Sequence, residues 1–375
     1  MKKACLIAHY GEDFLSYRIN FLKYLQSQDY ECFAIVPEDS FKPEVLKSGA
    51  KVYFYKYARN WKFIIYIPTL FYRLYKILGK EKPELIFTYK FMPNLIGILA
   101  ARIRGVKKIV GTLAGIGFMN KKDESLFIRI LFKIYCYVLN KADFVIFQNS
   151  EDLEMLKKSL PRPKLVLSNG SGVDKNRFNH STNNHDFLEK NGLSHHKEYL
   201  LFSTRIVSDK GIFELINAYK KASEKEPMKY DLLIAGWFDE KGLKNKVMSL
   251  IEQTNGIFWM GYQKNVSSLL SISSCIILPS YYPEGIPRSL TEAMAMKKPI
   301  ITTNFKGCKE TCVNDHNGLI VEPKSSDSLF QAMIKFNQLS ESRIKKMGES
   351  SHKLFLEKFE QNVVFQSISK SISIG

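Results

Sequence analysis

The stretch that decides the fold is Pro279-Ser280-Tyr281-Tyr282-Pro283-Glu284-Gly285-Ile286-Pro287-Arg288-Ser289-Leu290-Thr291-Glu292-Ala293-Met294-Ala295. The apolar run Cys275–Pro279 predicts a buried strand, and Arg288–Met296 predicts a helix that begins near Pro287, a residue favoured in a first helical turn. The loop between them holds Glu284 and Gly285. Free N–H groups and the positive end of the helix dipole point into this loop, so we expect an anion there. Strand, loop and helix in this order form the repeating unit of a parallel α/β sheet.

The same alternation continues in both directions along the chain. The predicted strands are Ala4–His9, Glu31–Val36, Val52–Tyr55, Leu85–Thr88, Lys108–Thr112, Phe144–Gln148 and Leu165–Ser168, then Tyr199–Ser203, Asp231–Ala235, Ile257–Met260, Cys275–Pro279, Pro299–Thr303 and Gly318–Val321. The predicted helices include Leu15–Gln28, Asn94–Ile103, Leu126–Asn140, Ile212–Ala222, Leu243–Glu252, Val266–Ile272, Ser326–Phe336 and Ser340–Phe359. A polar segment, Asn179–Lys197, separates the two series. The sequence therefore predicts two doubly wound α/β domains, with ligands at the carboxyl ends of the strands and in a cleft between facing domains.

The composition is that of an ordinary globular protein. The chain has 375 residues, of which 45% are hydrophobic and 25% charged, and no stretch reaches the roughly 18 apolar residues that span a bilayer. The apolar run after Met1-Lys2-Lys3 is shorter than the core of a signal peptide, so we interpret it as a buried first strand. The six cysteines show neither a Cys-x-x-Cys pair nor zinc-ligand spacing. Reduced thiols in the cytoplasm are the expected state.

The positive charge lies in the first half of the chain. Residues 1–177 contain 30 Lys and Arg against 16 Asp and Glu, a net +14, whereas the remainder contains 25 against 21, a net +4. Nucleic acid, an anionic membrane or a phosphate-rich substrate could use such charge. No nucleic-acid module is recognisable. Basic and large apolar residues alternate over Trp61–Leu78, which fits a helix lying among lipid headgroups and equally a core-facing helix with a solvated basic face. The asymmetry of the whole half favours the membrane.

Two carboxylates and two cations carry the predicted chemistry. Glu284 and Glu292 are suited to accept hydrogen bonds from sugar hydroxyls. When each residue is taken alone, helix N-capping explains Glu284 equally well, and a solvated position on the helix explains Glu292 equally well. Arg205 and Lys210 follow a strand end, where a guanidinium fork and a mobile ammonium could clamp a diphosphate; two solvated loop charges are the alternative. No Asp-x-Asp metal motif occurs. We therefore expect neither a metal nor a cofactor, and these cations would neutralise a leaving diphosphate.

A glycine follows the first predicted strand, in His9-Tyr10-Gly11. Gly11 would let the backbone cap a diphosphate or a sugar. A simple turn between strand and helix is an equally good interpretation.

The chain resembles the family-4 glycosyltransferases, which are retaining enzymes of the GT-B fold. The motifs that carry the resemblance are Glu284-x7-Glu292, Arg205-x4-Lys210-Gly211, Asn169-Gly170…Val173-Asp174…Phe178, Ala235-Gly236, Pro299–Thr303 and Asn317–Val321. The resemblance implies that Glu284 contacts the donor sugar as the catalytic residue. The expected diphosphate contacts are Arg205, Lys210, Gly11, Ile286, Pro287, Arg288 and Ser289, and the expected ribose and base contacts are Glu292, Leu290 and Tyr262.

A narrower likeness lies in Phe87–Ala101, Gly111–Phe118, Gly285–Ser289 and Gly307–Thr311. These segments are similar to bacterial members that build capsule, O-antigen or protein-linked glycans, including relatives of the enzyme that acts on undecaprenyl-diphosphate-linked bacillosamine. The likeness implies a UDP-sugar donor, with an N-acetylhexosamine as one candidate, and a polyprenyl-diphosphate-linked acceptor. It also implies a cytoplasmic enzyme, peripheral on the inner face of the plasma membrane. A UDP-sugar 2-epimerase of the same fold is the alternative.

The expected organisation follows from this resemblance. Residues 1–180 would form an acceptor- and membrane-facing domain, residues 181–355 a nucleotide-sugar-binding domain, and residues 356–375 a helix that crosses back to the first domain. The candidate acceptor and membrane contacts are Arg73, Lys76, Lys90 and Arg102.

Three departures from the family pattern stand out. Many members have Gly-Gly after the first strand, where this chain has His9-Tyr10-Gly11, and many place a histidine where Gly111–Phe118 has none. These two leave the catalytic residue of the first domain open. Lys297 replaces the usual glycine after the Arg288–Met296 helix, which predicts only a changed helix cap.

Overall fold

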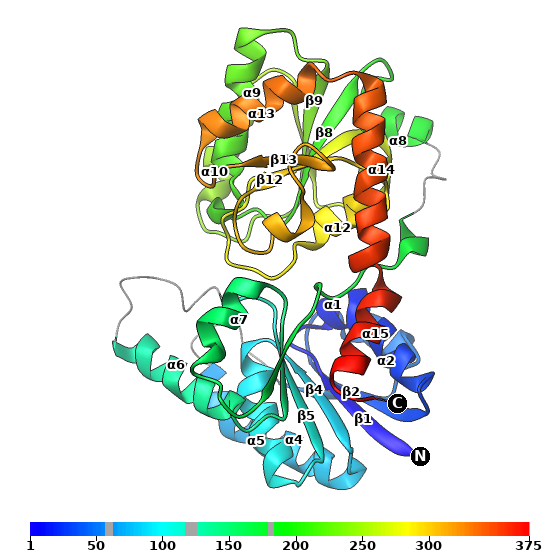
Figure 1. The fold of residues 1–375 in the computed structure, drawn as a ribbon, viewed down its shortest axis with the longest axis vertical. Coiled ribbons are helices and arrows are strands. Elements are labelled where there is room, and N and C mark those ends of the chain that lie inside the picture. Colours follow the sequence, from blue (N-terminus) through cyan, green and yellow to red (C-terminus); the bar gives the residue numbers. More distant parts are fainter. Residues whose placement is uncertain (57–62, 117–125, 179–183, 375) are drawn as a thin grey trace. The chain divides into compact units, whose positions relative to one another are not determined.

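A computed structural model describes residues 1–56, 63–116, 126–178 and 184–374. It divides the chain into two compact units, which Figure 1 shows. Unit 1 consists of residues 1–172 and 364–375, and unit 2 of residues 173–363. The division therefore falls at 172/173, where the sequence placed a boundary at 180/181. The terminal segment that groups with unit 1 starts at residue 364, where the sequence placed its start at 356.

Unit 1 is built on a seven-stranded parallel sheet in the order β3-β2-β1-β4-β5-β6-β7. Its strands are β1 (Lys2–Ile7), β2 (Tyr30–Pro37), β3 (Val52–Tyr55), β4 (Leu85–Tyr89), β5 (Lys108–Leu113), β6 (Phe144–Phe147) and β7 (Lys164–Leu167). The apolar run at the start of the chain forms β1, paired on both sides and buried, as predicted.

Helices cover both faces of this sheet. They are α1 (Gly11–Asp13), which continues through a π-helical turn (Phe14–Arg18) into α2 (Ile19–Gln26), then α3 (Lys42–Lys47), α4 (Phe63–Glu81), a π-helical turn (Pro93–Gly97) leading into α5 (Ile98–Ile103), α6 (Leu126–Leu139), α7 (Ser150–Lys157) and α15 (Gln361–Ser371). Buried residues of α4, α5 and α6 pack together on one face, and those of α2 and α15 pack on the other. The end of α15 is fixed by Lys108, whose Nζ donates to the carbonyls of Ile372 and Ser373 at 2.9 and 2.7 Å.

Unit 2 has a six-stranded parallel sheet in the order β10-β9-β8-β11-β12-β13. Its strands are β8 (Glu198–Ser203), β9 (Tyr230–Ala235), β10 (Ile257–Gly261), β11 (Ser273–Leu278), β12 (Ile300–Thr303) and β13 (Gly318–Val321). Its helices are α8 (Asn184–Lys190), α9 (Ile212–Lys225), α10 (Leu243–Glu252), α11 (Val266–Ile272), α12 (Arg288–Ala295), α13 (Ser326–Asn337) and α14 (Glu341–Lys358), with short 3-10 turns at Lys175–Arg177, Ser208–Lys210 and Lys309–Thr311. The prediction of two doubly wound parallel sheets is confirmed.

The strand order reverses once in each sheet, between β1 and β4 and between β8 and β11. Neighbouring connections leave in opposite directions at such a point, which opens a crevice at the carboxyl ends of the strands. The loops after β8 and β11 hold Arg205, Lys210 and Glu284. The topology thus places the predicted residues of unit 2 at its expected ligand-binding edge.

Helix α4 (Phe63–Glu81) covers most of the stretch Trp61–Leu78, for which the sequence left two interpretations open. Its side chains Leu70, Leu74 and Leu78 are buried in the core, while Arg73 and Lys76 are exposed. In its described part, therefore, α4 packs on the core with one side, and its exposed side combines Arg73 and Lys76 with Tyr72, which fits both interpretations. Trp61 lies outside the described residues. No helix in the described parts of the chain is long and apolar enough to cross a membrane.

Candidate active site

The loops after β8 and β11 touch at the backbone. The Tyr281 N–H donates to the Asp209 carbonyl at 2.9 Å. Gly211, just before α9, has φ +79°, and a Cβ there would lie 2.3 Å from the Pro279 carbonyl oxygen. Only glycine fits this approach. The glycine that follows Lys210 therefore brings its loop against the loop that carries Glu284.

Lys210 and Glu284 form an ion pair across these loops, between Nζ and Oε1. The Lys210 side chain is buried, and Glu284 is partly exposed. The Ser280 hydroxyl lies 3.4 Å from the same carboxylate oxygen and donates to it. The sequence predicted separate diphosphate and sugar roles for Lys210 and Glu284, and it gave no sign of their pairing, because 74 residues separate them.

The loop after β12 supports Glu284 from another side. Gly307 has φ +82°, and a Cβ at this position would lie 2.0 Å from the Gly285 carbonyl oxygen. The Thr303 hydroxyl donates to the Ser280 carbonyl. The loop that holds Glu284 is thus fixed by packed backbone, which preorganises its carboxylate.

Arg205 lies on the β8 side of the same edge. Its Nη1 donates to Asp239 Oδ2 at 2.9 Å, and its guanidinium carbon lies 5.3 Å from the centre of the Tyr282 ring. Burial would lower the pKa of Arg205, but its bonds to Tyr282 and Asp239 outweigh burial and raise it. The Lys210 ammonium lies 5.4 Å from the same ring. Tyr282 therefore has both predicted diphosphate-binding cations near its ring.

Helix α12 begins directly after this loop. Pro287 occupies its N-cap position and makes no side-chain cap, and the backbone amides of Ser289 and Leu290 lie in the first turn, at the positive end of the helix dipole. Arg288 donates to Glu292 Oε1 from Nε at 3.1 Å and from Nη2 at 2.9 Å. Glu292 is thus a partly buried, oriented carboxylate rather than a freely solvated one.

The remaining residues of this segment differ in what they can offer a ligand. Leu290 is buried in the core of unit 2, and Ile286 packs against that core. Any contact from Leu290 to a ligand would therefore come from its backbone. Ser289 is half-buried at the start of α12.

Tyr262 follows β10 and is exposed, and its contact with the base stays a prediction. Its ring meets Trp237 edge to face, with 5.6 Å between the ring centres. Sequence reasoning did not single out Trp237, although it directly follows the Ala235-Gly236 strand end. The two rings form an exposed aromatic corner at the carboxyl ends of β9 and β10.

Unit 1 also has a cluster of charged side chains around Asp13, near the carboxyl ends of the strands of its sheet. Arg18 Nε and Lys90 Nζ each lie 3.3 Å from its carboxylate, and the Tyr17 hydroxyl donates to it. Burial alone would raise the pKa of Asp13, but the charges of Lys90 and Arg18 outweigh it and hold the pKa well below its usual range. The Arg18 guanidinium lies 3.8 Å from the centre of the Tyr89 ring. The sequence placed Lys90 among acceptor and membrane contacts, and the structure gives it this carboxylate partner.

Gly11 lies beside this cluster. Its N–H donates to Asp39 Oδ2 at 2.7 Å, and a Cβ there would lie 2.6 Å from Asp39 Oδ1. The amide that the sequence offered to a diphosphate is thus bound by a carboxylate in this structure. Its role toward the donor stays a prediction.

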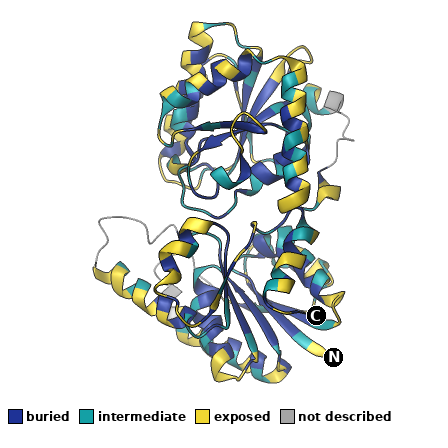
Figure 2. Cartoon of the chain, viewed as in Figure 1, coloured by how far each residue is buried: buried dark blue, intermediate teal, exposed yellow. Residues whose placement is uncertain are grey.

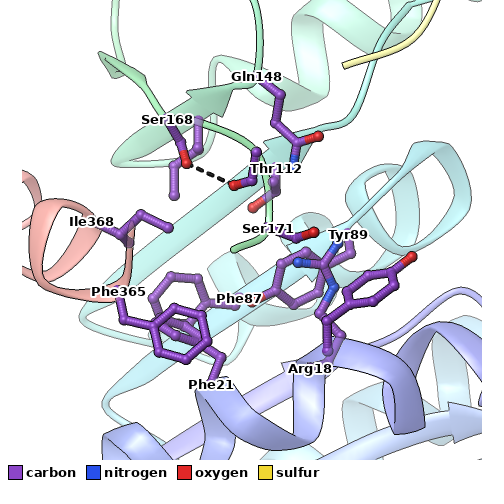
Figure 3. A pocket seen from close by; sticks show the side chains of 13 residues that line it. Arg18, Phe21, Phe87, Tyr89, Thr112, Gln148, Ser168, Ser171, Phe365 and Ile368 are labelled. Carbon is purple, nitrogen blue, oxygen red and sulfur yellow. Dashed lines mark hydrogen bonds between the residues drawn. The ribbon is translucent and has the colours of Figure 1, made fainter. Parts of the chain in front are cut away.

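A cavity opens at the carboxyl ends of β4–β7 (Figure 3). Arg18, Thr112 and Gln148 contribute polar side chains, while Phe365 and Ile368 of α15 add an apolar wall. Its volume is ≈ 20 Å³, enough for about one water molecule. In the present conformation the cavity cannot hold a sugar ring.

The other predicted contacts of unit 1 are on its surface. Arg73 and Lys76 are exposed on α4, and the Lys76 ammonium lies 4.7 Å from the centre of the Tyr72 ring. Arg102 donates to the Lys141 carbonyl at 2.8 Å and to Asp143 at 2.9 Å. Residues 117 and 118 of the narrower likeness lie outside the described residues. In the described ranges, no group of three or more His, Cys, Asp or Glu side chains is arranged to hold a metal.

Comparison with known families accounts for both units. Residues 183–353 match the family of glycosyl transferases group 1, and residues 3–149 match the glycosyl transferase 4-like family. The chain is a glycosyltransferase of group 1. The predicted enzyme class is confirmed.

Relatives of the glycosyltransferase include two enzymes with named substrates. It is 24% identical over 332 residues, 86% of each chain, to the N,N'-diacetylbacillosaminyl-diphospho-undecaprenol alpha-1,3-N-acetylgalactosaminyltransferase of Campylobacter jejuni. It is 24% identical over 319 residues, 83% of this chain and 81% of the other, to the UDP-Gal:alpha-D-GlcNAc-diphosphoundecaprenol alpha-1,3-galactosyltransferase of Escherichia coli.

Solved structures match over the full length. The Anabaena protein Alr3699/HepE, crystallised with UDP and glucose, is similar with a TM-score of 0.82 at 16% identity, covering 100% of both chains. A glycosyltransferase from Rickettsia africae is similar with a TM-score of 0.81 at 21% identity, covering 100% of this chain and 98% of the other. These likenesses confirm the GT-B fold.

Proposed function

We propose that the glycosyltransferase moves a sugar from a UDP-sugar to a polyprenyl-diphosphate-linked sugar, with retention of anomeric configuration, in the synthesis of a cell-surface or protein-linked glycan. The observation that carries the proposal is the Lys210–Glu284 pair at the carboxyl edge of unit 2. A cation for phosphate and a carboxylate for sugar hydroxyls lie side by side there. This juxtaposition suits a donor in which a sugar is bonded directly to a diphosphate.

The donor diphosphate would occupy the space between Lys210, Arg205 and the first turn of α12. Both cations now contact carboxylates, Glu284 and Asp239. A diphosphate carries more negative charge than one carboxylate and accepts several hydrogen bonds, so it can draw both cations to itself. The backbone amides of Ser289 and Leu290, in the first turn of α12, would add donors at the positive end of the helix; Pro287 has no N–H to contribute.

Release of Lys210 to phosphate would turn Glu284 toward the sugar. A carboxylate accepts hydrogen bonds from neighbouring hydroxyls, which orients the sugar ring. Glu292, held by Arg288, would accept from the ribose hydroxyls. The exposed corner of Tyr262 and Trp237 would contact the base.

The reaction would follow front-face attack. The acceptor hydroxyl oxygen forms a bond to the anomeric carbon while the bond from that carbon to the β-phosphate oxygen breaks. The departing phosphate oxygen takes the hydroxyl proton. Lys210, Arg205 and the α12 amides stabilise the charge that develops on this phosphate, so the proposal requires no metal.

Relatives support the choice of substrates. The names of the Campylobacter jejuni and Escherichia coli enzymes both specify a diphosphate-linked undecaprenol acceptor, and the Anabaena structure contains UDP. An acceptor of this kind is held in a bilayer by its lipid. We therefore place the enzyme peripherally on the cytoplasmic face of the plasma membrane.

A donor and acceptor panel tests the proposal. The protein is incubated with UDP-sugars, with and without polyprenyl-diphosphate sugars, in the presence and absence of EDTA, and the anomeric configuration of the product is read by NMR. We expect transfer only with both substrates, an axial or equatorial linkage matching that of the donor, and no loss with EDTA. Conversion of the UDP-sugar without an acceptor would instead indicate a 2-epimerase, and inversion would overturn the mechanism.

A further inference from the structure

Helix α6 exposes large apolar side chains on the side that faces away from the sheet. Leu126, Phe127, Ile130, Ile134 and Tyr137 are between 47 and 72% exposed. Residues 126, 130 and 134 are spaced by four, and 137 follows three later, which puts them on one face of the helix. We call these five side chains the outer face of α6; Figure 2 shows this helix as largely exposed.

The opposite side of α6 is firmly packed, so the exposure does not reflect a detached helix. Tyr135, Cys136, Val138 and Leu139 are buried in the core of unit 1. The Tyr135 hydroxyl accepts a hydrogen bond from Asn94 Nδ2 at 2.8 Å. A row of large apolar side chains that stays exposed on a firmly packed helix is typical of a surface that binds an apolar partner.

In the described part of the chain, cations predominate around the outer face. Helix α6 contains Arg129 and Lys133, both exposed, and no Asp or Glu. Just beyond its end the Lys141 ammonium lies 4.7 Å from the centre of the Tyr137 ring. Lys141 also lines a surface hollow together with Arg102 and Arg162, against the single carboxylate of Asp143. The surroundings of the outer face are therefore cationic.

We propose that the outer face of α6 inserts among the headgroups of an anionic bilayer. Apolar side chains flanked by cations suit this layer, where the side chains reach the acyl chains and the cations meet lipid phosphates. The inference rests on the proposed function, in which the acceptor is held in a membrane by its lipid. It names the surface that would bring the enzyme to that acceptor.

A second copy of the chain fits the outer face less well. Two such faces in contact would bring Arg129 and Lys133 toward the same cations of the partner, with no carboxylate on either helix. Five side chains are also far fewer than the roughly 20–30 residues per partner of a stable protein interface. Charge and size therefore both favour lipid.

Vesicle sedimentation tests this inference on the full chain. We expect the wild-type protein to bind vesicles of phosphatidylcholine with phosphatidylglycerol and to bind pure phosphatidylcholine weakly. The double variant Ile130→Glu/Ile134→Glu should lose at least tenfold in binding. The matched variant Val313→Glu/Leu356→Glu adds the same charge at exposed apolar positions of unit 2 and should bind like the wild type. Undiminished binding of the α6 variant would overturn the inference, as would a dimer that this variant splits.

A second variant tests insertion into the bilayer directly and does not depend on a loss of vesicle binding. Tyr137→Trp adds a fluorophore to the outer face, and lipids brominated along their acyl chains should quench its emission beyond that of the wild type, which has three tryptophans of its own. Absence of extra quenching would contradict insertion.

Transfer assays separate this inference from the proposed function. Ile130→Glu/Ile134→Glu should retain wild-type turnover on a short-chain, water-soluble diphosphate-linked acceptor and lose turnover on an acceptor embedded in vesicles. Equal loss on both acceptors would overturn the docking role of α6. If the wild-type protein binds vesicles and transfers sugar to neither acceptor, the proposed function fails while α6 docking stands.

Discussion

The two units hold charge differently at the carboxyl edges of their sheets. In unit 2, Arg205 and Asp239 form a pair that is about one-third exposed on each side, whereas Glu284 is 20% exposed and its partner Lys210 only 6%. In unit 1, the side chains of Asp13 and Arg18 are less than one-tenth exposed. Exposed pairs cost little to separate, whereas separating a buried pair leaves an uncompensated charge. The Arg205–Asp239 pair can therefore separate for a ligand at little cost. Lys210 is as buried as Arg18, so it can leave Glu284 only where another anion takes the place of that carboxylate. The Asp13 cluster, in which Asp13 and Arg18 are both buried, is built to hold the fold of unit 1.

Glu284→Gln is expected to have the largest effect on this contrast. Glutamine keeps the size of the side chain but loses the charge that orients the donor sugar and balances Lys210. We expect kcat to fall by about 10²–10³, the loss typical of one electrostatic contact in a transition state, while UDP affinity changes little. Steady-state kinetics and UDP calorimetry measure the two effects.

The same variant distinguishes front-face attack from a covalent mechanism. Mass spectrometry of the wild-type and variant enzymes after mixing with donor should show no sugar bound to residue 284. An adduct on Glu284 would refute the orienting role, and unchanged kcat would remove this residue from the site.

Asp13→Asn tests the other side of the comparison. Removing one partner of a buried ion pair costs about 3–5 kcal/mol, and we expect a loss of about 3 kcal/mol because Lys90 is partly exposed. UDP affinity should not change. Thermal or urea unfolding gives the stability, and a selective loss of UDP binding without loss of stability would show that unit 1 also exchanges partners at its edge.

The pH dependence of this variant carries a definite sign. The pKa of Asp13 in the folded protein is well below its ordinary value of 3.8, so its contribution to stability is complete above pH 3.8 and is lost as the pH falls toward the folded value. The difference in stability between the wild type and Asp13→Asn should therefore be constant from pH 7 to 5 and shrink in more acidic solution. A difference that grows on acidification would contradict the lowered pKa.

Arg205→Ala tests the accessible pair of unit 2 and should act on binding. A hydrogen bond to a charged group contributes about 1.5–3 kcal/mol, so UDP affinity should fall by roughly tenfold to a hundredfold. Arg205→Lys keeps the charge but loses the planar fork, and an intermediate loss is expected. Calorimetry with UDP measures both, and unchanged affinity in Arg205→Ala would refute the diphosphate role.

Most of the fold can be predicted from the sequence because buried parallel strands consist of continuous apolar runs. The predicted Ile257–Met260 and Gly318–Val321 strands lie within a residue of the observed bounds of β10 and β13. Local pattern cannot show which loop residues meet, so the Lys210–Glu284 pair and the Asp13 cluster emerge only from the topology. Helix α6 illustrates the same limit, since an apolar helix predicts burial but not which side is buried.

Lys297→Gly has the smallest expected effect and acts at the far end of the helix that carries Arg288 and Glu292. Lys297 has φ +57°, and the N–H groups of Lys297 and Lys298 donate to the carbonyls of Met294 and Ala293, which is the Schellman pattern of a helix end. This confirms the changed helix cap that the sequence predicted.

The lysine cannot relax out of this conformation, because a Cβ at Gly348 of α14 would lie only 2.1 Å from the Lys297 carbonyl oxygen. A left-handed residue other than glycine costs about 1 kcal/mol, so Lys297→Gly should stabilise unit 2 by about that amount in urea unfolding. Lys297→Ala removes the same side chain without relieving the backbone and should not stabilise. We expect UDP affinity to stay the same. A change in UDP affinity on Lys297→Gly would show that the C-terminal end of α12 influences ligand binding at its first turn. Ligand binding in unit 2 would then depend on buried packing, as the Asp13 cluster of unit 1 does.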